Sequence, residues 1–437
     1  MSRDWHLRKV IDIVKKVLLS VLISVFLLSL AACKKQVPKV EEKNKPIEKV
    51  DPIKEQIKTM TLDEKIGQMF IVGLDGYTIG DNSKELIEKY HVGGFILFSE
   101  NIKNSNQMLN LINSLKETNA NNKIPLFMAV DEEGGRVSRM PKELKKIPSN
   151  KKIGEVNSEE FSFKLGAAIG EEIKSFGFNV DFAPVLDINN NPKNPVIGDR
   201  SFGKEPDLVR KLGTQTMKGI QSQNVISVVK HFPGHGDTSV DSHADLPLIN
   251  NDLERLKSFE LIPFKDAIEN NTDGVMVAHI LLPKIDSENP ASLSKTVITD
   301  ILRGNLNFNG VVITDDMTMG AIMKNYNIGE AALKSINAGS DITLVCHGYN
   351  NEVEVINALK KAAEDGILTE ERIDESVYRI LKLKRKYDLN DNLIDSVDVN
   401  KINKNIEEVL SAYLKWGTHF PLIVNYNLIY IFVDWLA

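Results

Sequence analysis

The sequence predicts one α/β domain folded as a parallel (β/α)8 barrel of the TIM type. From Asp51 onward, eight short apolar runs alternate with segments of helical periodicity, and two-residue hairpin signals are few. Polar residues also follow many of these runs, as expected where parallel strands end at one face of a barrel. An open doubly wound sheet is the alternative. It is disfavoured because no Gly-rich phosphate loop opens the first helix.

The expected strands are the apolar runs, and helices fill most of the intervals between them. The strands are predicted at 69–74, 93–98, 125–131, 180–187, 225–229, 274–279, 310–315 and 341–346. Helices are predicted at 104–118, 159–176, 207–222, 253–269, 294–303, 330–338, 351–364 and 370–387. Ser158 stands where the N-cap of the second of these helices is expected.

The bulk composition is that of an ordinary globular protein. The chain has 437 residues, 26% of them charged, a formal net charge of -6 and a pI near 5.9. These values argue against a nucleic-acid-binding protein, which usually presents a basic face. The two cysteines, Cys33 and Cys346, are too few for a disulfide framework.

The N-terminus has the pattern of a secretory signal. Arg8, Lys9, Lys15 and Lys16 precede an apolar run at 17–30, which is short for a membrane span and suits a signal-peptide core. The run ends in Leu-Ala-Ala-Cys, which resembles the lipobox of a bacterial lipoprotein. That resemblance implies cleavage before Cys33, acylation of Cys33 and an extracytoplasmic location on the cell membrane. An uncleaved anchor helix is the alternative.

The expected organisation is a signal peptide at 1–32, a charged tether at 33–50, a barrel at 51–388 and a C-terminal segment at 389–437. The tether is rich in Lys and Glu, so it cannot bury enough apolar surface to fold. Residues 389–407 are rich in Asp and Asn and are interpreted as a linker. The end, 419–437, is apolar and aromatic, but its proline and polar breaks disfavour a transmembrane helix. The roughly fifty residues after the barrel are too few for a complete second α/β domain, and the role of this segment stays open.

The densest polar cluster lies at 230–243, directly after the predicted strand at 225–229. It contains three of the eight histidines of the chain. A metal site is one interpretation, because His231 and His235 are four residues apart; Pro233 and two glycines, however, prevent the helix that would pair them. A purely structural turn is a second interpretation, which explains the glycines but not the number of titratable groups.

Acid–base chemistry is the third interpretation of this cluster. Asp241 precedes His243 by two residues, so the two side chains of a loop can face the same way and form a hydrogen bond. A carboxylate that accepts from one ring nitrogen raises the basicity of the other. Asp315, which emerges from the strand at 310–315, supplies a carboxylate from elsewhere in the barrel.

The segments 230–243 and 310–317 resemble the two signatures of glycoside hydrolase family 3, in its bacterial β-N-acetylglucosaminidase branch. Supporting segments lie at 130–139 and 198–203, and the resemblance covers about 51–388. It implies that Asp315 is the nucleophile of a retaining mechanism, His243 the general acid/base and Asp241 its partner. The residues that match the family's sugar-binding positions are Asp131, Arg139, Arg200, Lys230 and His231. Asp187, His235 and His279 are left as supporting candidates.

The implied substrate is a terminal, non-reducing β-linked N-acetylglucosamine of a cell-wall or chitin-type saccharide. No metal or other cofactor is expected, and nucleic acid is not an expected partner. Two alternatives remain: a family member that acts on β-glucosides or β-xylosides, and a lipid-anchored sugar-binding protein without turnover. The pairing of Asp315 with the Asp241–His243 dyad argues against the second, since binding alone requires neither group.

Overall fold

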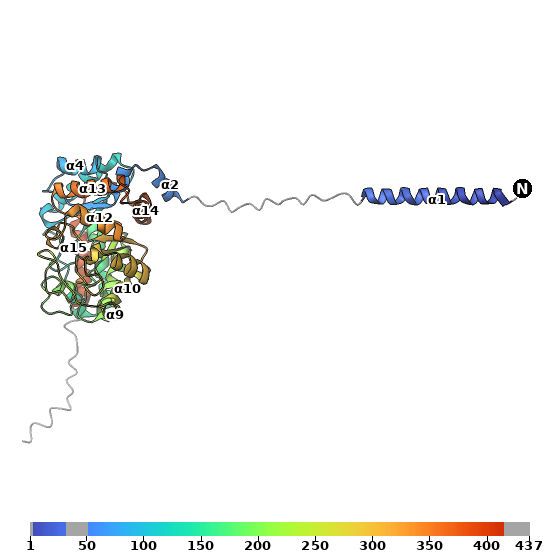
Figure 1. The fold of residues 1–437 in the computed structure, drawn as a ribbon. Coiled ribbons are helices and arrows are strands. Elements are labelled where there is room, and N and C mark those ends of the chain that lie inside the picture. The colour runs from blue at the N-terminus through green and yellow to red at the C-terminus, as the bar shows by residue number, and fades with distance from the viewer. Residues whose placement is uncertain (1–2, 32–50, 415–437) are drawn as a thin grey trace, which may run out of the picture. The chain divides into compact units, whose positions relative to one another are not determined.

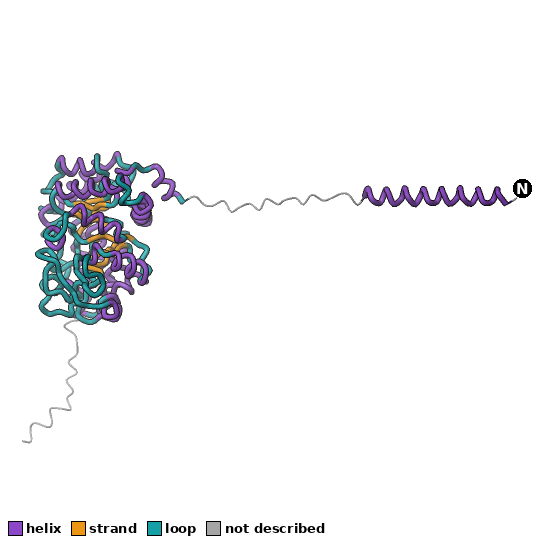
Figure 2. The backbone as a smooth tube through the Cα atoms, in the orientation of Figure 1, coloured by secondary structure: helices purple, strands orange, loops and turns teal. Residues whose placement is uncertain are grey.

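The structure, a computed structural model, describes residues 3–31 and 51–414. The chain divides into two units, 1–51 and 52–437, which are considered separately. The second unit contains an eight-stranded sheet in the order β7-β6-β5-β4-β3-β2-β1-β8, and all neighbouring strands are parallel. Ile342, just before β8, forms a parallel bridge with Ile313 of β7, and this contact joins the two edges. The predicted (β/α)8 barrel is confirmed, and its strands lie inside a layer of helices (Figures 1 and 2).

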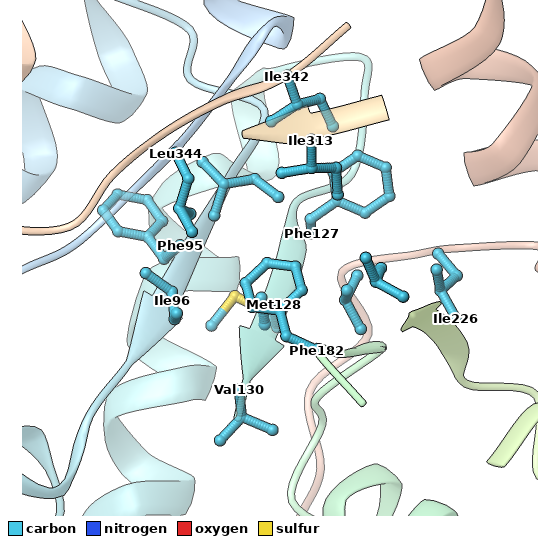
Figure 3. Close-up of a cluster of buried hydrophobic side chains, with 14 of the residues drawn as sticks. Phe95, Ile96, Phe127, Met128, Val130, Phe182, Ile226, Ile313, Ile342 and Leu344 are labelled. Atoms are coloured by element: carbon cyan, nitrogen blue, oxygen red, sulfur yellow. The ribbon is translucent and has the colours of Figure 1, made fainter. Parts of the chain in front are cut away.

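Each predicted apolar run contains a strand. The strands are β1 (Phe70–Val72), β2 (Gly94–Leu97), β3 (Phe127–Val130), β4 (Val180–Asp181), β5 (Ile226–Phe232), β6 (Gly274–Val277), β7 (Val311–Thr314) and β8 (Thr343–Val345). Every strand residue is buried, which is expected because the interior side chains cover one face of a barrel sheet and the helices cover the other. Figure 3 shows a cluster of buried apolar side chains to which β2, β3, β7 and β8 contribute.

The helices of this unit alternate with the strands. They are α2 (Pro52–Thr59), α3 (Leu62–Gln68), α4 (Asp81–Glu88), α5 (Ser105–Thr118), α6 (Asn150–Val156), α7 (Glu159–Ser175), α8 (Pro206–Ser222), α9 (Leu253–Ser258), α10 (Leu261–Glu269), α11 (Gly320–Met323), α12 (Ile328–Ala338), α13 (Tyr349–Glu364), α14 (Glu370–Lys386) and α15 (Val399–Leu414). Residues Thr296–Asn305 form a π-helix. Ser158 caps α7 as predicted, because its side chain accepts a hydrogen bond from the backbone N–H of Phe161.

The single helix expected at 253–269 is two helices. The break falls at Phe259, whose backbone has φ -144° and ψ -78°, outside the helical region. The Arg255 guanidinium stacks over the Phe259 ring at 4.1 Å and also binds the Glu260 carboxylate at 3.0 Å. These contacts fix the turn between α9 and α10.

The linker interpretation of residues 389–407 is wrong, because these residues pack on the barrel. The backbone N–H of Leu126, at the start of the third strand region, donates to the Asp391 carboxylate at 3.2 Å. Helix α15 then covers part of α7: Ile402 and Ile406 are buried, and the Tyr413 ring lies 4.6 Å from that of Phe161. The barrel unit therefore continues to at least the end of α15.

The N-terminal unit contains one helix, α1 (Arg3–Ala31). Among the helices of the described ranges 3–31 and 51–414, none combines the length and the apolar character needed to cross a membrane. Cys33 and the whole of the predicted tether at 33–50 lie outside the described residues. The apolar end at 419–437 also lies outside them.

Candidate active site

A cavity of about 180 Å³ lies at the carboxyl ends of the barrel strands. Its wall is contributed by the strand ends and by the loops that follow them, as in other barrels of this type. Seven of the predicted site residues line it, namely Asp131, Arg139, Arg200, Lys230, His231, His243 and Asp315. The predicted partner Asp241 is in contact with His243. Residues that are far apart in the sequence therefore meet at this end of the barrel.

Buried ion pairs form one side of the cavity. The Lys230 ammonium lies 2.5 Å from an Asp131 oxygen and 2.7 Å from a Glu133 oxygen. Glu133 also binds Arg200 in a bidentate pair, with N–O distances of 2.8 and 2.7 Å. Burial alone would raise the pKa of Glu133, but Arg200 and Lys230 hold it well below its ordinary value. Burial would likewise lower the pKa of Lys230, but Asp131 and Glu133 raise it. Glu133, Arg200 and Lys230 are therefore charged at neutral pH.

Arg139 lies beside this network with its guanidinium 3.9 Å from the second oxygen of Asp131. Its backbone N–H donates to Glu132 at 2.9 Å, so the chain around it is fixed. Its Nε is buried, and no hydrogen-bond partner for it is found among the described residues. The guanidinium thus has donors to offer a ligand in the cavity.

Asp187 orients the His231 imidazole from below the cavity. A carboxylate oxygen of Asp187 lies 2.6 Å from Nδ1 of His231, and the other accepts from the backbone N–H of His235 at 2.6 Å. Burial would raise the pKa of Asp187, but the two histidines lower it. Because an ionised carboxylate only accepts, Nδ1 of His231 carries the proton, and its Nε2 lies 3.3 Å from an Arg200 nitrogen.

Asp315 follows β7 directly and faces the cavity. Its backbone N–H donates to Val277 of β6 at 2.9 Å, and one carboxylate oxygen accepts from the N–H of Asp316 at 3.0 Å. Burial would raise the pKa of Asp315, but the imidazoles of His231 and His279 and the N–H of Asp316 together lower it. The carboxylate is therefore ionised at neutral pH and available as a nucleophile.

The predicted Asp241–His243 dyad is present. Nδ1 of His243 lies 2.7 Å from Oδ1 of Asp241, which also accepts the His243 backbone N–H at 2.9 Å. Burial would raise the pKa of Asp241, but these two hydrogen bonds lower it. The carboxylate therefore leaves Nε2 of His243 free to exchange a proton. The His243 side chain is 68% exposed, in contrast to the buried groups around Asp315.

The family assignment follows from comparison with known proteins. The family model "Glycosyl hydrolase family 3 N terminal domain" matches residues 61–383, well over half of the chain. The chain belongs to glycosyl hydrolase family 3.

Relatives within family 3 are named hexosaminidases. Beta-hexosaminidase A of Pseudoalteromonas piscicida is 38% identical over 333 residues, which is 71% of this chain and 56% of that protein. Beta-hexosaminidase LpqI of Mycobacterium tuberculosis is 33% identical over 330 residues, 74% of this chain and 82% of that one. This family 3 chain thus spans little more than half the length of the first of these relatives.

A solved family 3 structure has the same fold. The β-N-acetylglucosaminidase from Paenibacillus sp. str. FPU-7 superposes with a TM-score of 0.76 at 40% identity, covering 80% of this chain and 68% of that one. This similarity agrees with the barrel fold described above.

Sequence reasoning missed several residues of this family 3 site. Glu133 is the most important, because it joins Lys230 to Arg200; the run of three acidic residues at 131–133, after a buried strand, was the available signal. Phe98 and His347 also line the cavity, with ring centroids 5.1 Å apart. In the described part of the chain, no set of three or more His, Cys, Asp and Glu residues is arranged to hold a metal ion.

Proposed function

We propose that the protein is a retaining exo-β-N-acetylglucosaminidase that acts through a covalent glycosyl-enzyme. The observation that carries this proposal is the placement of two groups on one cavity. Asp315 and His243 both line it, and His243 is held through Nδ1 by Asp241. One group is an ionised carboxylate and the other is an imidazole oriented for proton exchange, which are the two functions that a double displacement requires.

In the first step Asp315 attacks the anomeric carbon while the glycosidic C–O bond breaks. Nε2 of His243 donates its proton to the departing oxygen, and Asp241 stabilises the imidazolium before transfer. In the second step His243 removes a proton from water, and the resulting hydroxide displaces Asp315 from the anomeric carbon. Two inversions restore the original configuration. Most retaining glycosidases use a second carboxylic acid as the proton donor; here a histidine takes that place.

The buried network supports recognition of sugar hydroxyls. Asp131, Lys230 and Arg200 offer charged donors and acceptors whose positions are fixed before the substrate arrives, so little reorganisation is needed on binding. The names of the relatives support an N-acetylhexosamine rather than glucose in this subsite. We therefore propose terminal N-acetylglucosamine of cell-wall or chitin-type saccharides as the substrate.

Turnover of aryl β-N-acetylglucosaminide tests this function. NMR of the first-formed sugar is expected to show the β-anomer, and the aryl β-glucoside is expected to react far more slowly. Asp315→Ala is expected to lose hydrolysis by a factor of about 10⁴ or more while its thermal unfolding stays close to that of the parent protein. Near-normal turnover by this variant, or an α-anomer as first product, contradicts the mechanism.

We further propose that the protein is a lipoprotein anchored at Cys33, outside the cytoplasmic membrane. The basic residues, apolar run and small residues before Cys33 support this location, where cell-wall fragments are directly accessible. Labelling with a radioactive fatty acid is expected to mark the parent protein and not Cys33→Ala. Equal labelling of both, or recovery of the parent protein from the cytosol, contradicts the anchor.

A further inference from the structure

We infer that helix α11, together with Lys324, positions the loop that carries His243 against the nucleophile. Gly320 and Lys324 are thus positioning residues for proton transfer, neither of which was identified from the sequence. This inference rests on the proposed function. It adds the contacts that hold the exposed Asp241–His243 dyad at a defined position relative to Asp315.

The loop needs such support because burial holds Ser242, which is 2% exposed and whose Oγ lies 3.2 Å from Nε2 of His235, but not the two side chains of the dyad. The side chains of His243 and Asp241 are 68% and 41% exposed. A hydrogen bond between two exposed side chains fixes their mutual geometry but not their position relative to the barrel. A retaining mechanism needs that position to be fixed, since a misplacement of about 1 Å costs about 10²-fold in rate.

Three consecutive backbone carbonyls of the loop are bound from one side. The N–H of Ala321 donates to the carbonyl of Ser242 at 3.1 Å, and the N–H of Gly320 donates to that of His243 at 3.2 Å. The Lys324 ammonium donates to the carbonyl of Ala244 at 2.6 Å. The two backbone donors belong to the first turn of α11, where N–H groups have no acceptor within the helix. The loop supplies the acceptors that this helix start lacks.

Glycine at position 320 permits this close approach. A Cβ atom there would lie 2.5 Å from the carbonyl oxygen of His243 and 2.9 Å from that of Ala244. Carbon and oxygen atoms do not approach so closely without repulsion, so any side chain at this position displaces the loop. The start of α11 therefore packs directly against the backbone of His243, and this packing requires glycine at position 320.

The same helix is tied to the nucleophile by a short, hydrogen-bonded segment. Asp316 follows Asp315, and its carboxylate accepts from the N–H of Thr318 and the N–H of Cys346, both at 2.9 Å. The N–H of Met319 donates to the carbonyl of Asp316 at 3.1 Å. The chain from the nucleophile to α11 is therefore bound to the residue that follows β8 as well as to itself. Through α11, both reacting groups are connected to the same element.

The test compares two variants with substrates that differ in their need for an acid. Lys324→Met removes the ammonium and keeps the apolar stem, and Gly320→Ala forces the loop away. For a saccharide or alkyl leaving group, which must be protonated, kcat/KM is expected to fall about tenfold in Lys324→Met and more in Gly320→Ala. For a 2,4-dinitrophenyl leaving group, which departs without protonation, kcat/KM is expected to change less than twofold. The kcat for that substrate should fall, because His243 must still activate water in the second step.

Two controls separate this inference from a general loss of structure. Lys382→Met changes an exposed lysine on α14 and is expected to leave both substrates unaffected. Lys324→Arg retains a charged donor and is expected to recover much of the lost rate. Equal losses for the two leaving groups in Lys324→Met, or no loss in either variant, overturn the inference. Failure of the proposed function gives a different result: the parent protein is then inactive, or His243→Ala loses no activity on the poor leaving group.

Discussion

Glu133 offers the most direct test of the buried charge network. Its side chain is 1% exposed and contacts two cations: Lys230, which is 2% exposed, and Arg200, which is 11% exposed. The substitution Glu133→Gln keeps the size and one acceptor oxygen but removes the charge. It also directs an amide NH2 group toward the cations that Glu133 now binds.

The expected cost follows from this geometry. Removing one partner from a buried ion pair destabilises a protein by about 3–5 kcal/mol, because the remaining charge is left uncompensated. Asp131 still neutralises Lys230 in the variant, since their atoms are 2.5 Å apart. We therefore expect the lower end of that range, about 3 kcal/mol, and a loss in kcat/KM of about 10²-fold from displaced Lys230 and Arg200.

Two measurements and a matched control decide the outcome. Urea unfolding gives the stability change, and hydrolysis of an aryl β-N-acetylglucosaminide gives kcat/KM. The control is Glu155→Gln on α6, where an exposed glutamate pairs with Lys152 at 2.6 Å and should contribute at most about 1 kcal/mol. If the two variants have equal stability and equal kcat/KM, the buried network does not have the role assigned to it.

Three further predictions concern other groups. His243→Ala should lose far more kcat/KM with poor leaving groups than with 2,4-dinitrophenyl; equal losses argue against an acid function. Burial, and then the charges of Glu132 and Asp181, raise the pKa of Glu172, so the fold keeps this carboxyl protonated where the unfolded chain ionises it. That contribution to stability is present at low pH and is lost as the pH rises through the folded-state pKa. Urea unfolding should therefore show Glu172→Gln gaining stability relative to the parent between pH 5 and pH 8. A difference in unfolding free energy that stays constant with pH contradicts this. Lys384→Met should lower the free energy of unfolding by about 2–4 kcal/mol in the same assay and leave kcat/KM unchanged. The Lys384 ammonium donates to oxygen atoms of Gln68, Gly93 and Pro125 at 2.7–2.9 Å, and the substitution leaves these acceptors unpaired. An unchanged stability refutes this role.

The strand ends were predictable because they depend on one regularity. Apolar runs mark buried parallel strands, and the residues that follow them meet at one face whatever their separation in the chain. Asp131 and Asp315 could thus be assigned to one site without knowledge of their distance. The N-cap at Ser158 was predictable for a similar reason, since it depends on residues within one turn.

Contacts between distant polar side chains were not predictable in the same way. Glu133 is one of three consecutive acidic residues, and nothing local distinguishes the one that reaches Lys230 and Arg200. The segment at 389–407 was misinterpreted because its Asp and Asn residues are typical of loops. Asp391 instead binds the N–H of Leu126 and the side-chain amide of Asn119, at 3.2 and 2.7 Å, and these contacts fasten a polar sequence to the barrel. A polar composition predicts that a segment is exposed to solvent, but it does not indicate which of its polar groups form hydrogen bonds with the rest of the protein.

The charge balance of the network bears on the chemistry as well as on binding. Lys230 contacts both Asp131 and Glu133, and Arg200 contacts Glu133, so two basic groups are paired with two acidic ones. The sugar is neutral when it binds, but positive charge develops at its anomeric carbon in the oxocarbenium-like transition state. An uncompensated cation beside that carbon would oppose this charge, whereas a balanced network supplies oriented hydrogen bonds without doing so. Loss of the Glu133 charge should consequently lower kcat more than it raises KM, because the ground state carries no charge for the cations to repel. An effect confined to KM would show instead that Glu133 only orients the sugar.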